Sequence, residues 1–193
     1  WAYGRGTSVV RGGVRAGPLT AFPVQGGWDG YTREREYLTD VIDRADVDNF
    51  VTLTGDMHCY LAGYKQTKYR DALQWLLRGP VDADQRVGVE FMTPPVTSQT
   101  VSEALTLNLD PTGISGKFVS WAVRKMNPHI EFFDSNHWGY SVVEFTRDDC
   151  TYIGYDIDKT VDSSDADKDV LVAIRAPDGA VQMQDGTEEK REG

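Results

Sequence analysis

The sequence predicts an α+β fold built from a mixed sheet and flanking helices, and two observations support this prediction. Residues 32–45 carry apolar side chains at helical spacing and lead, after a short loop, into an apolar strand over residues 50–54. Residues 129–157 instead contain closely spaced segments of alternating apolar and polar side chains, typical of antiparallel strands with one solvated face. With 193 residues, of which 40% are hydrophobic, the chain is long enough to bury a core.

The overall charge argues against two classes of partner. A net charge of −10 and a pI of about 4.7 disfavour binding to nucleic acids and to anionic membranes, because both are polyanions. No apolar run approaches the roughly 20 residues of a membrane-spanning helix, and no signal peptide is visible. Abundant Asp with little Lys favours a halophilic protein, whose self-repulsion is screened by salt. We therefore expect the fold to melt at a lower temperature without added salt than in molar salt.

The first half of the chain leads to a pair of side chains that can bind metal. Residues 1–27 are rich in Gly and form a loop-rich entry segment. The apolar stripe of the following helix is expected to face the core; it consists of Tyr37, Leu38, Val41, Ile42 and Ala45. The strand over residues 50–54 is interpreted as buried, and it ends just before Asp56 and His58. In an extended backbone these two side chains point the same way, which suits a shared metal ion. The alternative is a turn aspartate beside a packed histidine.

The rest of the chain alternates between helices and strands up to an acidic extension, residues 158–184, and a tail, residues 185–193, that is expected to be disordered. Residues 60–69 are interpreted as a polar segment rich in tyrosine. The sequence predicts helices over residues 71–77 and 115–126, strands over residues 87–92, 129–134, 139–145 and 150–157, and a last hairpin from residues 170–174 and 180–183. Residues 135–138 are expected to be the turn of a hairpin.

The histidines and cysteines narrow the choice of chemistry. His137 sits in a polar turn between two predicted strands, where it could bind a metal or an oxyanion; an exposed turn residue is the alternative. His129 is expected to pack or to bond the backbone. Cys59 and Cys150 do not make a disulfide scaffold or a CxxC pair, and Cys59 is interpreted as packed and reduced rather than as a ligand.

Several blocks of sequence, in order between residues 28 and 157, resemble the PhoD-type alkaline phosphatases, a branch of the calcineurin-like metallophosphoesterases. The blocks are residues 28–31, 51–58, 88–98, 127–130 and 136–140. The resemblance implies a β-sandwich flanked by helices that hydrolyses phosphate mono- and diesters with a cluster of iron and calcium. It also implies a protein that is secreted, periplasmic or exposed at the cell surface.

The resemblance also implies roles for particular residues. It places Asp56, His58 and His137 in metal- and phosphate-binding positions, with His137 and Asp56 as catalytic residues. Metals held there would polarise the phosphoryl oxygens and lower the pKa of a bound water toward 7. The side chains expected to line the mouth of the site and to bind substrate are Tyr31, Asn136 and Trp138.

The chain departs from the family in one respect. The remaining ligands of the family, which include a cysteine, aspartates, a tyrosine and an asparagine, have no counterpart here. Residues 28–157 are therefore interpreted as the C-terminal half of the catalytic domain, inactive or weak alone and completed by a separate N-terminal half. The rival interpretation is a non-catalytic module that keeps the fold and acts as a binding or structural partner. A nuclease-like or phospholipid-cleaving relative is a third alternative.

Overall fold

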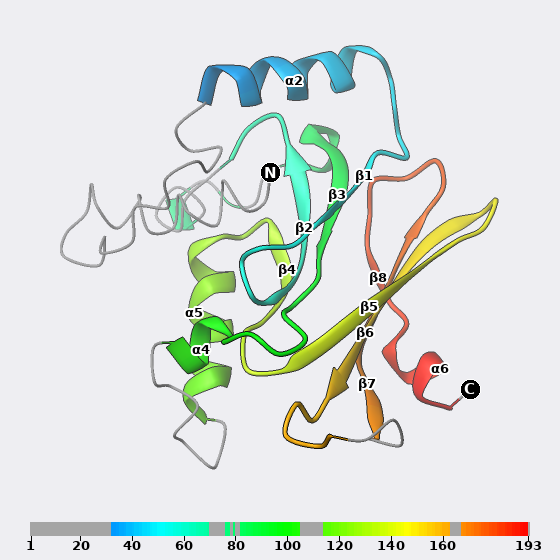
Figure 1. Ribbon diagram of the computed structural model, residues 1–193. Helices are drawn as coiled ribbons and strands as arrows, with labels where there is room; N and C mark the ends of the chain where they lie inside the picture. The colour runs from blue at the N-terminus through cyan, green and yellow to red at the C-terminus, as the bar shows by residue number, and fades with distance from the viewer. Residues whose placement is uncertain are drawn as a thin grey trace.

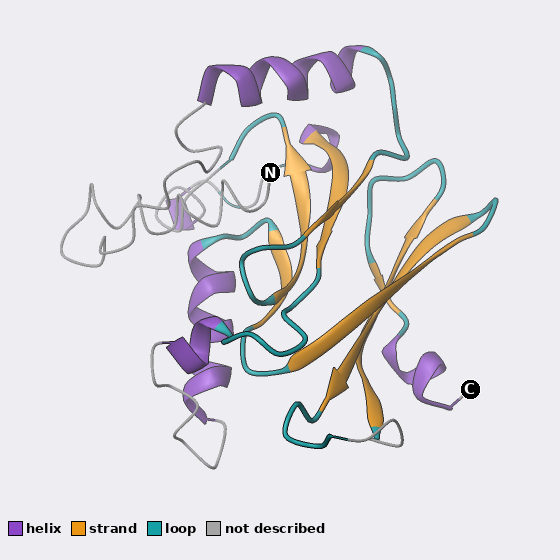
Figure 2. Cartoon of the chain, viewed as in Figure 1, coloured by secondary structure: helices purple, strands orange, loops and turns teal. Residues whose placement is uncertain are grey.

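The computed structural model describes residues 32–69, 76–77, 79, 82–104, 114–162 and 167–192, which form two four-stranded sheets with helices around them (Figures 1 and 2). The two sheets lie against each other, and helices cover the outer face of the first sheet (Figure 2). The predicted α+β class is confirmed. The predicted entry segment over residues 1–27 and most of the predicted helix over residues 71–77 lie outside the described residues.

The first sheet is mixed and has the strand order β1-β3-β2-β4. β1 (Val51–Thr54) pairs in parallel with β3 (Arg86–Met92). β2 (Tyr60–Gln66) is antiparallel to β3 on one side and to β4 (Ile130–Asp134) on the other. β2 therefore lies inside the sheet and is buried along its whole length.

The segment over residues 60–66, which was interpreted only as polar and rich in tyrosine, is a buried strand. One face of β2 packs Tyr60 and Tyr64 into the core between the sheets. The other face carries Lys65, whose ammonium lies 2.8 Å from Glu90 of β3, with both side chains fully buried. Burial lowers the pKa of Lys65, and Glu90 opposes that shift. A lysine and two tyrosines in one strand hide the apolar alternation on which the sequence argument relied.

The prediction that residues 50–54 form a buried strand was only partly right. The strand is present as β1, but it lies at an edge of the sheet, and its one partner among the described residues is β3. Leu53 of this strand is 52% exposed. The apolar composition therefore indicated a strand correctly and its burial incorrectly.

The second sheet is an antiparallel meander in the order β5-β6-β7-β8. Its long strands are β5 (Trp138–Phe145), β6 (Asp149–Ile157) and β7 (Lys168–Pro177). The predicted hairpin with its turn at residues 135–138 does not form. β4 pairs with β2 of the first sheet and β5 pairs with β6, so residues 135–137 cross from one sheet to the other.

The C-terminal tail is ordered over most of its length, in contrast to the prediction of disorder. β8 (Gln184–Asp185) pairs with β7, and α6 (Thr187–Glu192) follows it; the predicted strand over residues 180–183 is not formed. Thr187 accepts a 3.0 Å hydrogen bond from the backbone N–H of Ala173 and donates one of 2.6 Å to Asp185. These bonds hold the start of α6 against the sheet.

Three helices and a 3-10 turn complete the described residues. They are α2 (Thr32–Arg44), η2 (Ala83–Gln85), α4 (Val101–Ala104) and α5 (Ile114–Met126). The two predicted helices over residues 32–45 and 115–126 are thus confirmed. α5 packs Val119 and Val123 against Ile130 and Phe133 of β4. Among the described residues, no helix has the length and apolar character needed to cross a membrane.

The apolar stripe of α2 faces solvent, not the core as expected. Tyr37, Leu38 and Val41 are 68%, 38% and 45% exposed. The buried positions of this helix are instead the polar residues Arg35 and Thr39.

The main core lies between the two sheets. Phe91 of β3 stacks on Tyr152 of β6 with ring centroids 4.9 Å apart. The Tyr152 hydroxyl donates a 2.8 Å hydrogen bond to the carbonyl of Met92, which joins the sheets directly. Cys59 is a buried free thiol, as predicted. Cys150 is buried and free as well, and burial raises its pKa to about 11.

Tyr60 fixes how the sheets align at the end where β5 begins. Its fully buried ring extends from β2 onto Gly154 of β6, where an added Cβ would lie 2.9 Å from the ring. The Tyr60 hydroxyl donates a 2.5 Å hydrogen bond to the carbonyl of Tyr155 and lies 3.4 Å from the carbonyl of Trp138. A Cβ at Gly139 would overlap the Tyr60 hydroxyl and the Tyr155 carbonyl.

We predict that Gly139→Ala destabilises the protein by about 3 kcal/mol, because the added methyl group has no space between the sheets. The control is Gly55→Ala, since no atom lies within 4 Å of a Cβ at that position. Urea unfolding of both variants provides the measurement. Equal stability of the two variants would contradict the sheet alignment described here.

Candidate active site

The strand directions bring three loops to one edge of the first sheet, by which we mean the edge formed by the C-terminal ends of β1 and β3. β1 and β3 are parallel, so the loops after Thr54 and Met92 leave from the same edge. β2 begins and β4 ends at that edge, because Tyr60 pairs with Asp134. Residues 55–59, 93–100 and 135–137 are therefore neighbours, although they are far apart in the sequence.

The loop after β1 does not have the extended conformation that the sequence argument assumed. Asp56 and His58 have φ angles of 74° and 54°, in the left-handed region that non-glycine residues rarely adopt. The alternation that places residues i and i+2 on one side applies only to an extended strand, so that argument was wrong here. Strained residues of this kind concentrate at functional sites, where surrounding structure holds them.

His58 is oriented by the loop after β3. Its Nδ1 donates a short hydrogen bond to the carbonyl of Gln99. A carbonyl oxygen can only accept, so Nδ1 must carry the proton in the neutral ring. Nε2 then has its lone pair available for a metal ion or a substrate proton. The backbone carbonyl of His58 also accepts a 3.4 Å bond from the N–H of Val101.

The same loop reaches the second sheet. The indole N–H of Trp138 donates a 3.0 Å hydrogen bond to the carbonyl of Ser98, and the N–H of Gly139 donates a 3.1 Å bond to the carbonyl of Pro95. Residues 93–100 therefore connect His58 to the start of β5, directly after His137.

Asp134 holds His137 through three hydrogen bonds to one carboxylate oxygen. The donors are the His137 ring Nδ1 at 2.9 Å, the His137 backbone N–H at 3.0 Å and the Asn136 backbone N–H at 2.9 Å. The bond to Asp134 raises the pKa of His137, against the opposing effect of burial. Burial disfavours the ionised form of Asp134, but the hydrogen bonds outweigh it and its pKa is lowered. As in His58, Nε2 remains for a ligand.

Asn136 does not extend toward the mouth, where it was expected. Its side chain lies on Gly116 of α5, so closely that a Cβ there would overlap the amide. Its Oδ1 is buried and has no hydrogen-bond partner among the residues that the structure describes. Tyr31, the other predicted substrate contact at the mouth besides Trp138, lies outside the described residues.

Four residues that the sequence argument did not select surround His137 and Trp138. Lys159 places its ammonium 4.1 Å from the centre of the Trp138 ring and forms hydrogen bonds of 2.8 and 2.9 Å with Glu103. Asp134 and Asp156 are the other two. Burial raises the pKa of Asp156, and the charge of His137 partly offsets this shift. The contact between Asp134 and His137 could have been anticipated from the sequence, because the two residues lie three positions apart just before a strand.

The donors suit a metal ion in kind but not in number. Each of the two histidines has its Nδ1 bonded to an oxygen acceptor, which is the arrangement that orients histidine ligands in metal sites. Across the part of the chain that the structure describes, however, no three His, Cys, Asp or Glu side chains are grouped so as to hold a metal ion. A complete coordination sphere would need further ligands.

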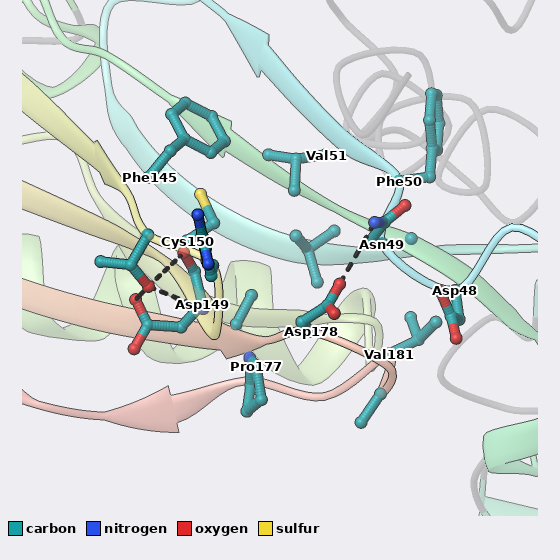
Figure 3. Close-up of a pocket in the computed structure, with 16 residues that line it drawn as sticks. Asp48, Asn49, Phe50, Val51, Phe145, Asp149, Cys150, Pro177, Asp178 and Val181 are labelled. Atoms are coloured by element: carbon teal, nitrogen blue, oxygen red, sulfur yellow. Dashed lines mark hydrogen bonds between the residues drawn. The ribbon is translucent and has the colours of Figure 1, made fainter.

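A separate cavity of about 120 Å³ lies at the opposite edge of the sheets (Figure 3). It is lined by residues at the start of β1 and by the turn between β5 and β6, including Phe50, Phe145 and Cys150. At its rim, Asn49 donates a 3.2 Å hydrogen bond to Asp178. None of the predicted site residues that the structure describes lines this cavity.

Comparisons with known proteins agree on one family. A family model described as PhoD-like phosphatase matches residues 9–152. Alkaline phosphatase D from Bacillus subtilis (strain 168) is 26% identical over 128 residues, which are 66% of this chain and 18% of that protein. A solved structure described as "Structure of PhoD" has a TM-score of 0.57 and 18% identity, and the match covers 83% of this chain and 26% of that one. The chain thus spans less than a third of either relative.

We predict that Asp56→Gly is more stable than Asp56→Ala by about 1 kcal/mol, the reverse of the usual order. Both substitutions remove the same exposed carboxylate, so the difference isolates the left-handed backbone at this position. Thermal unfolding of the two variants measures it. A more stable alanine variant would show that the loop after β1 is not held in this conformation.

Proposed function

The chain belongs to the family of PhoD-like phosphatases, and we propose that it takes part in the hydrolysis of phosphate mono- and diesters by a metal-activated water. In this proposal Asp56, His58 and His137 bind metal, and His137 and Asp56 act in catalysis. The observation that carries the proposal is that the rings of His58 and His137 are held in the same way. Both are anchored through Nδ1 beside the same edge of the first sheet, and Nε2 is left for a ligand.

Iron and calcium are the metals proposed, on the basis of the family resemblance. When bound, such ions polarise phosphoryl oxygens and lower the pKa of water. The roles proposed for the residues of this chain are to bind and to orient. Asp134 fixes the ring of His137 by holding its Nδ1, so that Nε2 can present its lone pair to a metal ion. Asp56 offers a carboxylate exposed to solvent.

Substrate contacts are proposed mainly for Trp138. Its ring is partly exposed beside His137 and is held by the Ser98 carbonyl and the Lys159 ammonium. Tyr31 stays a prediction. Asn136, whose side chain lies on α5, contributes instead by holding the turn that carries His137.

The proposed activity requires more protein than this chain. The chain spans 18% of the length of its curated relative, and its described residues supply no group of three metal donors. We therefore propose that a separate N-terminal half completes the site and that the isolated chain is inactive or weak. By the same family resemblance, the proposed location is outside the cytoplasm.

A non-catalytic binding or structural module is the second candidate. The lack of a three-donor group among the described residues favours it. It differs from the first candidate in one measurable respect, since it would gain no activity when the missing ligands are supplied.

The test is hydrolysis of an aryl phosphate monoester and the matching diester in the presence of iron and calcium. The chain is assayed alone and with a polypeptide comprising the part of alkaline phosphatase D that precedes the matched segment. We expect turnover only in the mixture, reduced about 100-fold or more by His137→Ala or Asp56→Asn. Glu131→Gln, at an exposed carboxylate of β4, is the control and should have no effect. An inactive mixture would favour the non-catalytic module.

A further inference from the structure

The segment that follows β3 bonds to His58 and then continues into α4. The carbonyl of Gln99 accepts the hydrogen bond from Nδ1 of His58, and the N–H of Val101 donates a 3.4 Å bond to the carbonyl of His58. We define the bridging segment as residues 99–103, which cover the end of the loop after β3 and the start of α4. His58 is therefore held by this segment through both its ring and its backbone.

The bridging segment also bonds to the turn that carries His137. The hydroxyl of Ser102 lies 2.7 Å from the hydroxyl of Ser135, and the N–H of Ser102 donates a 3.4 Å hydrogen bond to the carbonyl of Ser135. Ser102 is fully buried, and Ser135 is only 3% exposed. Because water cannot replace a lost partner at such a depth, removal of either hydroxyl leaves the other unsatisfied, which is costly.

Two further contacts shape the bridging segment. α4 spans a single turn, so it depends on its surroundings for stability. The hydroxyl of the buried residue Thr100 accepts a 3.1 Å hydrogen bond from the N–H of Glu103 and thereby caps the helix. Glu103 bonds to Lys159, whose ammonium lies over the Trp138 ring. Neighbouring residues of one turn thus reach His58, the turn before His137 and Trp138.

We propose that Ser102 is a positioning residue, which fixes His58 relative to His137 by holding the bridging segment on the turn at Ser135. This inference rests on the proposed function, in which the two histidines serve one site. The connection between them is short. His58 bonds to Gln99, which lies close before Ser102 in the sequence, and Ser135 lies just before His137.

The neighbouring polar contacts do not perform the same task. Asp134 orients the ring of His137 but belongs to the same turn, so it does not relate that ring to His58. The ion pair of Glu103 with Lys159 is partly exposed, and solvent weakens such pairs. The buried hydroxyl pair is the contact whose loss should be felt at both histidines, because ligands of one ion must be held to a fraction of an ångström.

The first test needs no metal and uses hydrogen exchange. Ser102→Ala removes one hydroxyl of the pair, and Ser135→Ala removes the same bond from the other side. In both variants the backbone N–H groups at positions 101 and 102 should exchange about tenfold faster, because the segment detaches more often. The matched control is Ser141→Ala, which removes a 3.0 Å bond to the hydroxyl of Tyr152 inside the sandwich and should leave these two rates unchanged.

The amides of β3 serve as the reference for global unfolding. The inference predicts an increase confined to the bridging segment. It is overturned if the rates at positions 101 and 102 do not rise, or if those of β3 rise by the same factor, since the hydroxyl pair would then act only on global stability.

The second test measures the affinity of the chain for Co²⁺ by calorimetry, with and without His137. Ser102→Ala should lower this affinity about tenfold. In a His137→Ala background it should have no effect, because His58 then binds alone. An equal loss in both backgrounds would contradict the inference. If His137→Ala alone leaves the affinity unchanged, the proposed metal site fails, and the role of Ser102 is decided by the exchange rates.

Discussion

The contact of Tyr60 with the second sheet is the constraint on which the candidate site depends. Tyr60 belongs to β2, which lies inside the first sheet, while His137 and Trp138 stand at the start of the second sheet. The hydrogen bond to Tyr155 and the packing on Gly154 fix one sheet on the other at this end. Together with the hydrogen bonds made by residues 93–100, this contact sets the separation between the loop after β1 and the turn before β5.

The chemistry follows from this alignment and from strand direction. Parallel pairing of β1 with β3 and antiparallel pairing of β2 and β4 direct three loops to one edge. Residues 93–100 then bond to both sides, reaching His58 through Gln99 and the second sheet through Ser98. The two imidazoles are thereby oriented by oxygen acceptors before any ligand arrives, which reduces the reorganisation that binding requires.

The sequence indicated the fold class and most elements, because helical spacing and strand alternation are local signals. β2 was missed, since Lys65 and Glu90 place an ion pair inside a sheet where the pattern analysis expects apolar residues. The crossing at residues 135–137 was mistaken for a hairpin, because strand spacing does not reveal which partner a strand selects. Asp56, His58 and His137 were selected by residue type and family resemblance. Asp134 could have been noticed from its spacing to His137, whereas Lys159 contacts Trp138 from a distant part of the chain that only the fold brings near.

The proposal that His58 and His137 bind the same ion is tested most directly by NMR of the imidazole groups during titration with Co²⁺. The chain contains three histidines, and His129, which is buried, serves as an internal reference. The account predicts that the resonances of His58 and His137 shift together, at the same ion concentration, while those of His129 do not. Separate midpoints for His58 and His137, or a shift of only one of them, would contradict it.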